Sequence, residues 1–375
     1  MNDRPSYEVV VVGGGPAGMT TALYATRLGH RTAVVEARGG RHAAVSHVHN
    51  QYGVSEDVSG RELSRHAIGQ LEEYGADYYP DRVDAVRRMD ATDERFVEGR
   101  DGPDDRFVVE GRDTTVGAER VVLATGFVDR EPSVPGLERF AGRGLHYCLH
   151  CDAYTLGDER VFVLGHDDHA ATVAMLMLNF TADVELLLDD RAPEWSDETE
   201  RQLRAHPVER VDAEVVRAYA DDESEAVDAY ADDESTDETW LGGLAFAGGA
   251  RREYRGGFAM YGKEYNTALA KSLGCDLDDD GAIAVDDAYE TSVDGVYAVG
   301  DVTHGQNQTV VAMGDGAKAG MALHKDLRRF PRAVDELDAL DASAAPAVAD
   351  DLRARMRLNR ERDTHSGLRD PSPNY

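Results

Sequence analysis

The residues best suited to chemistry in this sequence are two cysteines separated by two residues, in the segment Cys148-Leu149-His150-Cys151-Asp152. Two thiols at this spacing near the start of a helix can close a small disulfide, and the positive end of the helix dipole stabilises a thiolate there. A zinc site would need a second pair of ligands, and the three cysteines of the sequence supply no second Cys-x-x-Cys. The pattern therefore predicts a redox-active pair and no metal, with two inert core cysteines as the alternative. We expect the third cysteine, Cys275, to pack in the interior.

A glycine-rich segment near the N-terminus has the form of a phosphate cradle. Gly13-x-Gly15-Pro16-Ala17-Gly18 follows a predicted buried strand over 7–12 and precedes a predicted helix over 19–28. In this context the first glycine allows a tight turn, the second lets a pyrophosphate approach the backbone, and the third permits close helix–strand packing. Glu36, at the end of the next predicted strand, can accept a ribose hydroxyl. The segment predicts a β-α-β dinucleotide-binding unit, with a plain glycine-rich turn as the alternative.

The elements that must position these residues form two such units. A second strand–helix–strand pattern begins near residue 160, with strands predicted over 160–164 and 184–188 and a helix over 168–179. We therefore expect an α/β fold of two Rossmann-like dinucleotide-binding domains. The first is discontinuous, over 1–128 and 258–330. The second is inserted over 129–257 and carries the cysteine pair, and residues 331–375 form a C-terminal extension.

A second segment points to the nucleotide. Thr291-Ser-Val-Asp-Gly-Val-Tyr-Ala-Val-Gly300-Asp301 resembles the T-x5-[FY]-A-x-G-D segment of two-dinucleotide-domain flavoproteins. The resemblance implies that Asp301 bonds the ribityl chain of FAD. Together with the Gly13 motif and with Ala124-Thr125-Gly126 after a predicted strand, it predicts that the chain binds FAD. The alternative is a buried strand that ends in a structural Gly-Asp turn.

With a flavin expected, Cys148 to Asp152 resembles the C-x-x-C-D redox centre of the thioredoxin reductase family, and the resemblance covers about residues 5–330. It implies that Cys151 faces the flavin, that Cys148 exchanges with the substrate disulfide and that Asp152 acts as acid and base. His146 and His150 could tune the thiolates. The resemblance also implies a homodimer, and a thioredoxin-like protein or a small thiol or disulfide as the partner.

Other positions match the same family. Asn50, in His-Asn-Gln-Tyr-Gly, stands where the family has E-N-[FYW]-P-G, although the proline is absent. Gly40 and Arg41 fall in the loop beside the flavin. Val83 resembles the backbone contact to adenine, and Gln308 precedes a predicted helix over 310–323 whose N-terminus would face the flavin ring.

The resemblance breaks at the second cradle, which binds NADPH in the family. The middle glycine of G-x-G-x-x-A is Asp167, in Gly165-His-Asp167-Asp168-His-Ala170, so that two carboxylates would face the pyrophosphate. The basic H-R-R-x3-R segment that grips the 2′-phosphate is replaced by Leu-Asp189-Asp-Arg191. We therefore doubt that NADPH is the electron donor.

Two alternatives follow from this loss, and a third is independent of it. Some relatives of thioredoxin reductase take electrons from ferredoxin. Others, the dithiol oxidases, pass electrons from a dithiol through FAD to oxygen. Their centre tends to read C-P-x-C-[HD]-G-[YW]-E; this chain shares the aromatic residue at Tyr154 but lacks the Pro, Gly and Glu, so it lies between the two patterns. A non-enzymatic flavin-binding redox sensor is the third.

Charge excludes several partner classes. The sequence has 40 basic and 72 acidic residues, a net charge of −32, which repels nucleic acid and anionic lipid and is typical of proteins from a high-salt cytosol. The absence of a long apolar run and of a secretion signal predicts a cytoplasmic protein without a membrane span.

Ala-Tyr-Ala-Asp-Asp-Glu-Ser occurs at 218–224 and again at 229–235, within a predicted acidic, solvated insertion over 212–239. A basic run after residue 353 suggests that the extension docks on the acidic body, ahead of a disordered tail.

Overall fold

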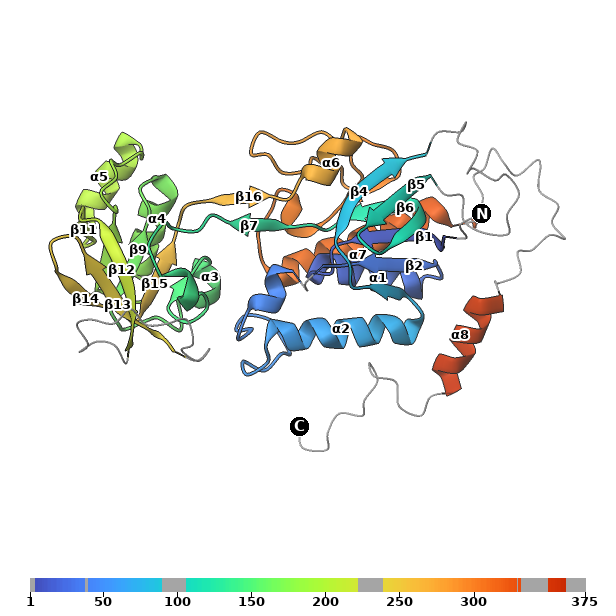
Figure 1. Cartoon of the computed structure of the whole chain (residues 1–375), viewed down its shortest axis with the longest axis horizontal. Coiled ribbons are helices and arrows are strands. Elements are labelled where there is room, and N and C mark those ends of the chain that lie inside the picture. The colour runs from blue at the N-terminus through green and yellow to red at the C-terminus, as the bar shows by residue number, and fades with distance from the viewer. Residues whose placement is uncertain are drawn as a thin grey trace. The chain divides into compact units, whose positions relative to one another are not determined.

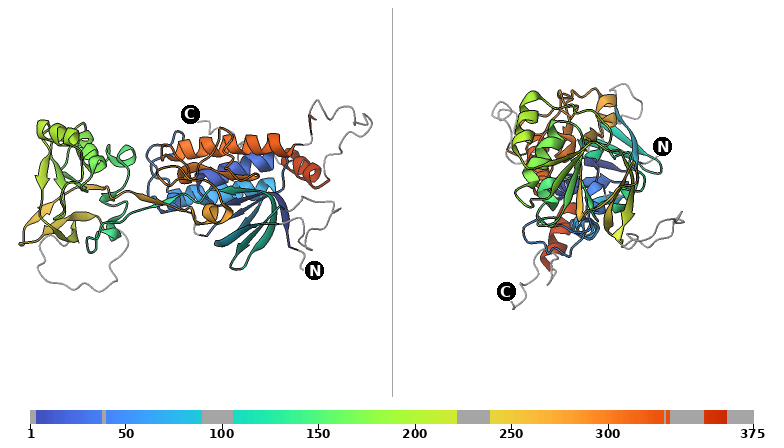
Figure 2. Two further views of the ribbon diagram at one scale, coloured as in Figure 1. Left: turned by 90° about the horizontal axis from the view of Figure 1, so that it is seen from above. Right: turned by 90° about the vertical axis from the view of Figure 1, so that its left-hand side faces the viewer.

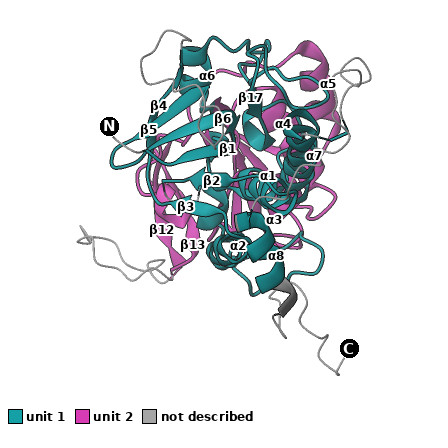
Figure 3. Cartoon of the chain, turned by 90° about the vertical axis from the view of Figure 1, so that its right-hand side faces the viewer, with its two compact units in different colours: residues 1–127, 265–375 teal, residues 128–264 magenta. Residues whose placement is uncertain are grey.

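The chain folds into two compact units. The structure is a computed structural model that describes residues 4–37, 40–89, 106–221, 239–328, 330–331 and 350–361. Unit 1 comprises Met1–Phe127 and Tyr265–Tyr375, and unit 2 comprises Val128–Glu264 (Figure 3). The inserted unit thus extends to Glu264 rather than to residue 257, because β15 (Gly256–Ala259) pairs with strands of unit 2.

Unit 1 is built on a seven-stranded sheet (Figure 1). Its order is β3-β2-β1-β6-β5-β4, with β17 also paired to β6. The pairs β1–β2, β1–β6, β2–β3 and β6–β17 are parallel, and β4–β5 and β5–β6 are antiparallel. The strands are β1 (Ser6–Val12), β2 (Thr32–Val35), β3 (Asp77–Tyr79), β4 (Val83–Arg88), β5 (Phe107–Gly111), β6 (Thr115–Leu123) and β17 (Val296–Ala298). The valines of β1 are buried on both faces, as the uninterrupted apolar run predicts.

The helices of unit 1 are α1 (Pro16–Arg27), α2 (Gly60–Tyr74), α6 (Ala268–Leu273), α7 (Thr309–Leu327) and α8 (Asp350–Glu361), with short 3₁₀ turns at Arg41–Ala44 and Gly300–Val302. Helix α1 begins at Pro16 rather than at residue 19, because proline at the first helical position loses no hydrogen bond. The Ser59 side chain caps α2 by accepting a bond from Glu62 N, and Gly75 ends the helix in the left-handed region. Helix α7 packs along α1 (Figure 2).

Unit 2 contains a five-stranded parallel sheet in the order β11-β10-β9-β15-β8. Its strands are β8 (Leu145–His146), β9 (Val161–Leu164), β10 (Val184–Leu187), β11 (Glu209–Val211) and β15. An antiparallel sheet is made of β12 (Val215–Ala220), β13 (Leu241–Phe246) and β14 (Arg251–Glu253). The helices are α3 (Leu149–Asp152), α4 (Asp168–Met177) and α5 (Asp197–Ala205), with a 3₁₀ turn at Glu138–Phe140. The chain enters and leaves along the paired strands β7 (Phe127–Asp129) and β16 (Lys263–Tyr265).

Part of the predicted acidic insertion is ordered sheet. Residues 215–220 form β12, and Ala218, Tyr219 and Ala220 of the first duplicated copy are buried. The Tyr219 hydroxyl donates to the Arg252 carbonyl at 3.1 Å. The expectation of a solvated excursion from residue 212 is therefore wrong for these residues, because they pair with β13. The remaining 222–238 lie outside the described residues, as does the tail after 361.

The C-terminal extension contains α8, which lies against unit 1. Arg355 Nη1 donates to the Gly75 carbonyl at 3.3 Å, at the C-terminal end of α2. A guanidinium placed on the last carbonyls of a helix also meets the negative end of its dipole. This contact agrees with the expectation that the basic extension docks on the body. Among the described residues, no helix combines the length and apolar character needed to cross a membrane.

Candidate active site

The first cradle joins β1 to α1. Gly13 has φ +111, and a Cβ there would lie 2.3 Å from the Ala124 carbonyl oxygen; a Cβ at Gly18 would lie 2.0 Å from the Gly13 oxygen. These two glycines are required by the packing of the chain on itself. Gly15 differs, because among the described residues no atom beyond its chain neighbours lies within 4 Å of a Cβ built on it. The space in front of Gly15 is open, which fits a ligand that approaches the backbone.

Glu36 and the Gly300–Asp301 turn border this cradle. Glu36 is 8% exposed at the end of β2, and its Oε2 accepts a hydrogen bond from Gly14 N. Gly300 has φ +70, and a Cβ on it would lie 2.5 Å from Ala17 Cβ, so Asp301 is placed beside the start of α1. Asp301 is half-buried. The structure therefore brings the glycine motif, Glu36, Ala124 and Asp301 to one end of the sheet.

The predicted residues Asn50 and Gln308 meet each other. Asn50 Nδ2 donates to Gln308 Oε1 at 2.8 Å, and Gln308 is the N-cap residue of α7. Gln308 makes no side-chain cap bond to α7. The loop that carries Asn50 is thus tied to the start of α7.

The other predicted positions of unit 1 are placed as follows. Gly40, at φ +63, precedes the 3₁₀ turn, and the Arg41 guanidinium lies 4.7 Å from the centre of the Phe127 ring. Gly126, at φ +62, accepts a bond from Asn266 N at 3.0 Å. Val83 is half-buried at the start of β4 and packs against the core of unit 1.

The cysteine pair is a disulfide. Cys148 and Cys151 are bonded, with their Cα atoms 5.3 Å apart, and Cys148 is the N-cap residue of α3. Both residues are half-buried. Cys275 is a free buried thiol, as expected, and its Sγ lies 3.4 Å from Thr291 Oγ1. Among the described residues, no group of three or more His, Cys, Asp or Glu side chains is placed to hold a metal ion.

Asp152 has a histidine partner. His146 Nδ1 lies 3.1 Å from Asp152 Oδ2, and the two side chains are 8% and 20% exposed. The other candidate, His150, is exposed on α3. Of the two histidines that could tune the thiolates, His146 is the one that contacts Asp152.

The second cradle is closed by its own side chain. Asp167 is the N-cap residue of α4 and its Oδ1 accepts from Ala170 N at 2.9 Å. Asp167 and Gly15 have the same extended backbone, each with ψ 177, but Gly15 carries no side chain and makes no cap bond. At the start of α4, the Asp167 carboxylate therefore binds a backbone N–H. At the start of α1 no side chain of the described residues binds the corresponding N–H groups, which is the arrangement that suits an anionic ligand.

Asp168 does not face this cradle, which corrects the expectation of two carboxylates there. Its Oδ1 accepts from Thr199 Oγ1 at 2.5 Å, and from Ser196 N and Ser196 Oγ at 3.0 Å each. These bonds, that of Thr199 first, lower the pKa of Asp168. The side chain turns to the start of α5, where Ser196 and Thr199 present three donors.

The segment that stands in place of the family's basic H-R-R-x3-R motif also makes internal contacts. Asp189 Oδ1 accepts from Val215 N at 2.8 Å, and the Arg191 guanidinium lies 5.2 Å from the centre of the Tyr261 ring. Burial, followed by the charge of Asp189, raises the pKa of Tyr261 to about 12. The one arginine of this segment is therefore engaged with an aromatic face.

Two features escaped the sequence analysis. His42, in the 3₁₀ turn Arg41–Ala44, has its Nδ1 3.4 Å from the Oγ1 of Thr309, the first residue of α7. Burial lowers the pKa of His42. The position of His42 directly after Gly40-Arg41, two predicted site residues, could have indicated it from the sequence. In unit 2, buried Glu185 of β10 pairs with Arg252 at 2.6 Å and accepts from the Tyr254 hydroxyl. A lone glutamate in an apolar strand is the signal for such a network.

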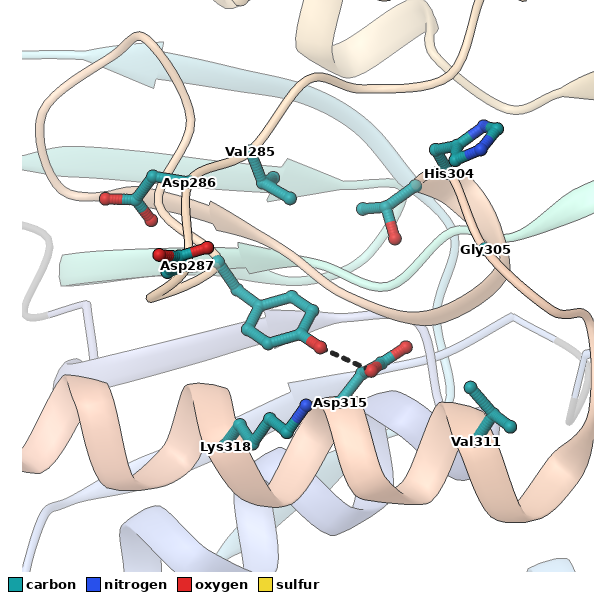
Figure 4. A pocket seen from close by; sticks show the side chains of 10 residues that line it. Val285, Asp286, Asp287, His304, Gly305, Val311, Asp315 and Lys318 are labelled. Atoms are coloured by element: carbon teal, nitrogen blue, oxygen red, sulfur yellow. Dashed lines mark hydrogen bonds between the residues drawn. The ribbon is translucent and has the colours of Figure 1, made fainter.

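A hollow of about 270 Å³ lies elsewhere on unit 1 (Figure 4). In it the Tyr289 hydroxyl donates to the Asp315 carboxylate of α7. Its lining contains none of the predicted site residues; it consists of Val285, Asp286, Asp287, Tyr289, Thr303, His304, Gly305, Val311, Asp315 and Lys318.

Comparisons with known proteins identify the family. Residues 7–316 match the family model described as pyridine nucleotide-disulphide oxidoreductase. Alkyl hydroperoxide reductase of Pseudomonas putida (its F subunit) is 32% identical over 332 residues, which are 88% of this chain and 60% of that protein. The thioredoxin reductase of Peptoclostridium litorale is 28% identical over 85% of this chain and 96% of its own length.

Among solved structures, thioredoxin reductase from Streptococcus pyogenes matches with a TM-score of 0.73 and 26% identity, over 87% of this chain and 99% of that one. The chain spans about 60% of the length of the alkyl hydroperoxide reductase proteins that it matches. The family match covers most of both units, including the first cradle and the cysteine pair. The chain therefore belongs to the pyridine nucleotide-disulphide oxidoreductase family, as a thioredoxin reductase-like member.

Proposed function

We propose that the protein is an FAD-dependent thiol–disulfide oxidoreductase that moves two electrons between the flavin, the Cys148/Cys151 pair and a thioredoxin-like protein or a small disulfide. The observation that carries the proposal is the disulfide at the start of α3, followed directly by Asp152. A disulfide next to an acid–base group is the arrangement that thiol–disulfide exchange requires. A homodimer is part of the proposal, on the resemblance to thioredoxin reductases.

Membership of the family implies FAD, and the residues of unit 1 fit it. Gly15 leaves open space at the start of α1, Glu36 is buried at the end of β2, and Asp301 follows Gly300, which approaches Ala17 of α1. In the proposal Gly13 to Gly18 hold the pyrophosphate, Glu36 a ribose hydroxyl and Asp301 the ribityl chain. Gly40, Arg41, Asn50 and Gln308 border the ring, Val83 the adenine, and Ala124 and Gly126 complete the site. The bound flavin would supply a two-electron acceptor or donor.

The cysteines and Asp152 divide the exchange between them. Cys148 attacks or is attacked by the substrate sulfur, and Cys151 closes or opens the internal disulfide. Asp152 takes the proton of the ionising thiol in one direction and returns it in the other.

We propose that unit 2 does not bind NADPH and that the electrons come from another donor. The Asp167 carboxylate caps α4, Asp189 is bonded to Val215 N, and Arg191 lies on Tyr261. The first contact uses a backbone donor of the α4 N-terminus, the second puts a carboxylate where the family has a basic segment, and the third engages the one arginine of that segment. The same observation favours a second function, oxidation of a substrate dithiol with oxygen as the final acceptor; reduced ferredoxin is the alternative donor for disulfide reduction.

The test is an anaerobic titration of the flavin-loaded protein in molar KCl, in which the absorbance of the oxidised flavin at about 450 nm is followed. Dithiothreitol should bleach the flavin in the wild type and in Cys275→Ala, and should fail in Cys151→Ser. Stoichiometric NADPH should leave the band unchanged. Bleaching by dithiothreitol in Cys151→Ser would contradict the role of the pair, and bleaching by NADPH would contradict the proposed loss of the nicotinamide site.

A further inference from the structure

We propose that His146 is a positioning residue for the reaction: it holds the Asp152 carboxylate in the orientation from which that group exchanges protons with the cysteine pair. This inference rests on the proposed function and adds to it a residue that the C-x-x-C-D motif does not contain. Its basis is the geometry of unit 2 between β8, α3 and β15.

The sheet holds His146 in place. His146 is the last residue of β8, opposite Phe258 in the parallel pair with β15. Its ring packs on the fully buried Phe258 ring, with 6.0 Å between the ring centres. With 8% of the side chain exposed, the imidazole has little freedom to turn.

The polar contacts of the ring converge on one partner. Nδ1 lies 3.1 Å from Asp152 Oδ2, whereas Nε2 is buried and has no hydrogen-bond partner among the described residues. A carboxylate can only accept, so in the proposal the His146 Nδ1 carries the hydrogen that points across this 3.1 Å contact. A histidine kept for packing would normally satisfy both ring nitrogens. The buried imidazole instead leaves one nitrogen unpaired and commits the other to Asp152.

Asp152 needs such a support. It ends a helix of four residues, Leu149–Asp152, and its side chain is 20% exposed. A general acid or base works only within hydrogen-bond reach of the proton that it moves, and a free carboxylate samples several rotamers. In the proposal, the contact with His146 Nδ1 selects one of these orientations before the substrate arrives, as supporting polar contacts behind a catalytic group usually do.

The exchange balances without any further reactant. A substrate thiol gives its proton to Asp152, and the resulting thiolate bonds to Cys148 Sγ while the Cys148–Cys151 bond breaks and Cys151 leaves as a thiolate, which takes the proton back from Asp152. The second substrate thiol then gives its proton to Asp152 and its sulfur displaces Cys148, whose thiolate takes that proton in turn. The substrate dithiol is oxidised to a disulfide, the protein disulfide is reduced to two thiols, and two electrons and two protons pass from one to the other. The reverse sequence reduces a substrate disulfide.

The experiment measures the reduction of the Cys148–Cys151 disulfide itself. The flavin-loaded protein is mixed anaerobically with dithiothreitol, quenched with acid and alkylated. Mass spectrometry then counts the alkylated cysteines, so that the readout does not depend on the flavin. His146→Leu removes the donor, and His146→Asn places an amide N–H where Nδ1 was. His206→Asn is the matched control, because His206 is an exposed histidine of unit 2 bonded to the Gln202 carbonyl.

We expect His146→Leu to slow the reduction by about tenfold or more, because loss of a positioned acid–base group costs at least this much. His146→Asn should stay within about threefold of the wild type, and His206→Asn should match it. If His146→Leu does not fold, His146→Gln, whose amide reaches the Nε2 place, takes its role. A rate of disulfide reduction in His146→Leu within about twofold of the wild-type rate would overturn the inference. Equal decreases of this rate in His146→Leu and His146→Asn would overturn it as well.

A double mutant separates positioning from packing. If His146 acts through Asp152, then Asp152→Asn combined with His146→Leu should be no slower than Asp152→Asn alone. Losses that multiply would mean that His146 acts independently, and would also overturn the inference. Failure of the proposed function looks different: the wild-type disulfide would itself not be reduced by dithiothreitol, or its reduction would not bleach the flavin.

Discussion

Asn50 and Gln308, 258 positions apart in the sequence, are joined by a hydrogen bond of 2.8 Å from Nδ2 to Oε1. The bond links the loop after Gly40 to the residue that starts α7. Both residues were predicted from separate motifs to lie at the flavin. Their contact brings the two motifs to one place in unit 1, and it can be tested apart from any activity.

The first prediction concerns this pair. Asn50→Leu and Gln308→Leu should each weaken FAD retention, and the double mutant should lose less than the sum, with a coupling of about 0.5 to 1 kcal/mol because the bond is exposed. The measurement is FAD affinity by flavin fluorescence for the four proteins of the cycle. Strictly additive effects would show that the two side chains do not cooperate.

The second prediction separates two neighbouring aspartates of α4. Asp167→Gly should open the helix N-terminus and increase NADPH affinity by at least about tenfold, since it removes a carboxylate from the pyrophosphate position. Asp168→Asn should leave NADPH affinity unchanged and lower the melting temperature, because its carboxylate holds the start of α5. Isothermal titration with NADPH in molar KCl checks both. Equal effects of the two substitutions would contradict the different orientations of their side chains.

The third prediction concerns thiol reactivity. Burial raises the pKa of the Cys275 thiol, so at neutral pH this group stays protonated and unreactive. In the dithiothreitol-reduced native protein, iodoacetamide should label Cys148 first and should leave Cys275 unlabelled until the protein is denatured. Peptide mass mapping over a time course distinguishes these cases. Labelling of Cys275 at the rate of Cys148 would mean that unit 1 opens locally around β17.

The fourth prediction is a pH dependence of stability. Burial, then the neighbouring His30 and Arg328, lower the pKa of His324, whose Nδ1 lies 3.0 Å from His30 Nε2; His30 in turn contacts Glu8 at 3.1 Å. A histidine with a lowered pKa binds a proton more readily in the unfolded chain. The contribution of His324 to the free energy of unfolding is therefore present above the pKa of a histidine in the unfolded chain, about 6.5, and is lost as the pH falls below that value.

His324→Gln should remove part of this loss. The melting temperature of the wild type should fall more between about pH 7.5 and about pH 5.5 than that of the variant, measured by calorimetry in molar KCl. His42, whose pKa burial also lowers, contributes in the same direction and sets a residual slope in the variant. An identical pH response in the two proteins would refute the assignment to His324.

Much of the site could be predicted from the sequence because its signals are local. The glycines of the first cradle, the strand before them and the helix after them lie within residues 6–27, and each glycine there has a steric reason that the structure bears out for Gly13 and Gly18. The spacing of Cys148 and Cys151 places both on one short turn. Such patterns survive in any tertiary setting, since neighbouring residues along the chain enforce them.

The partners of polar side chains could not be predicted in this way. Nothing in the sequence around Asp167 and Asp168 says that the first caps its own helix while the second accepts bonds from Ser196 and Thr199 at the start of α5. The choice depends on α5 lying beside α4, which packing decides. The prediction of a solvated segment from residue 212 was wrong over β12 for the same reason. β12 is a strand because it pairs with β13, which pairs in turn with β14, and Tyr219 is buried.

Residue type and spacing along the chain were enough to predict a dinucleotide cradle, a cysteine pair that can form a disulfide and the departure from the second cradle, because backbone sterics and charge act locally. The contact of the His146 ring, rather than that of His150, with Asp152 and the place of Arg191 on Tyr261 required the folded structure. Hydrogen bonds and ring contacts between separate elements depend on where the sheets place them. The order of the strands in unit 2 sets those positions, and no local pattern records it.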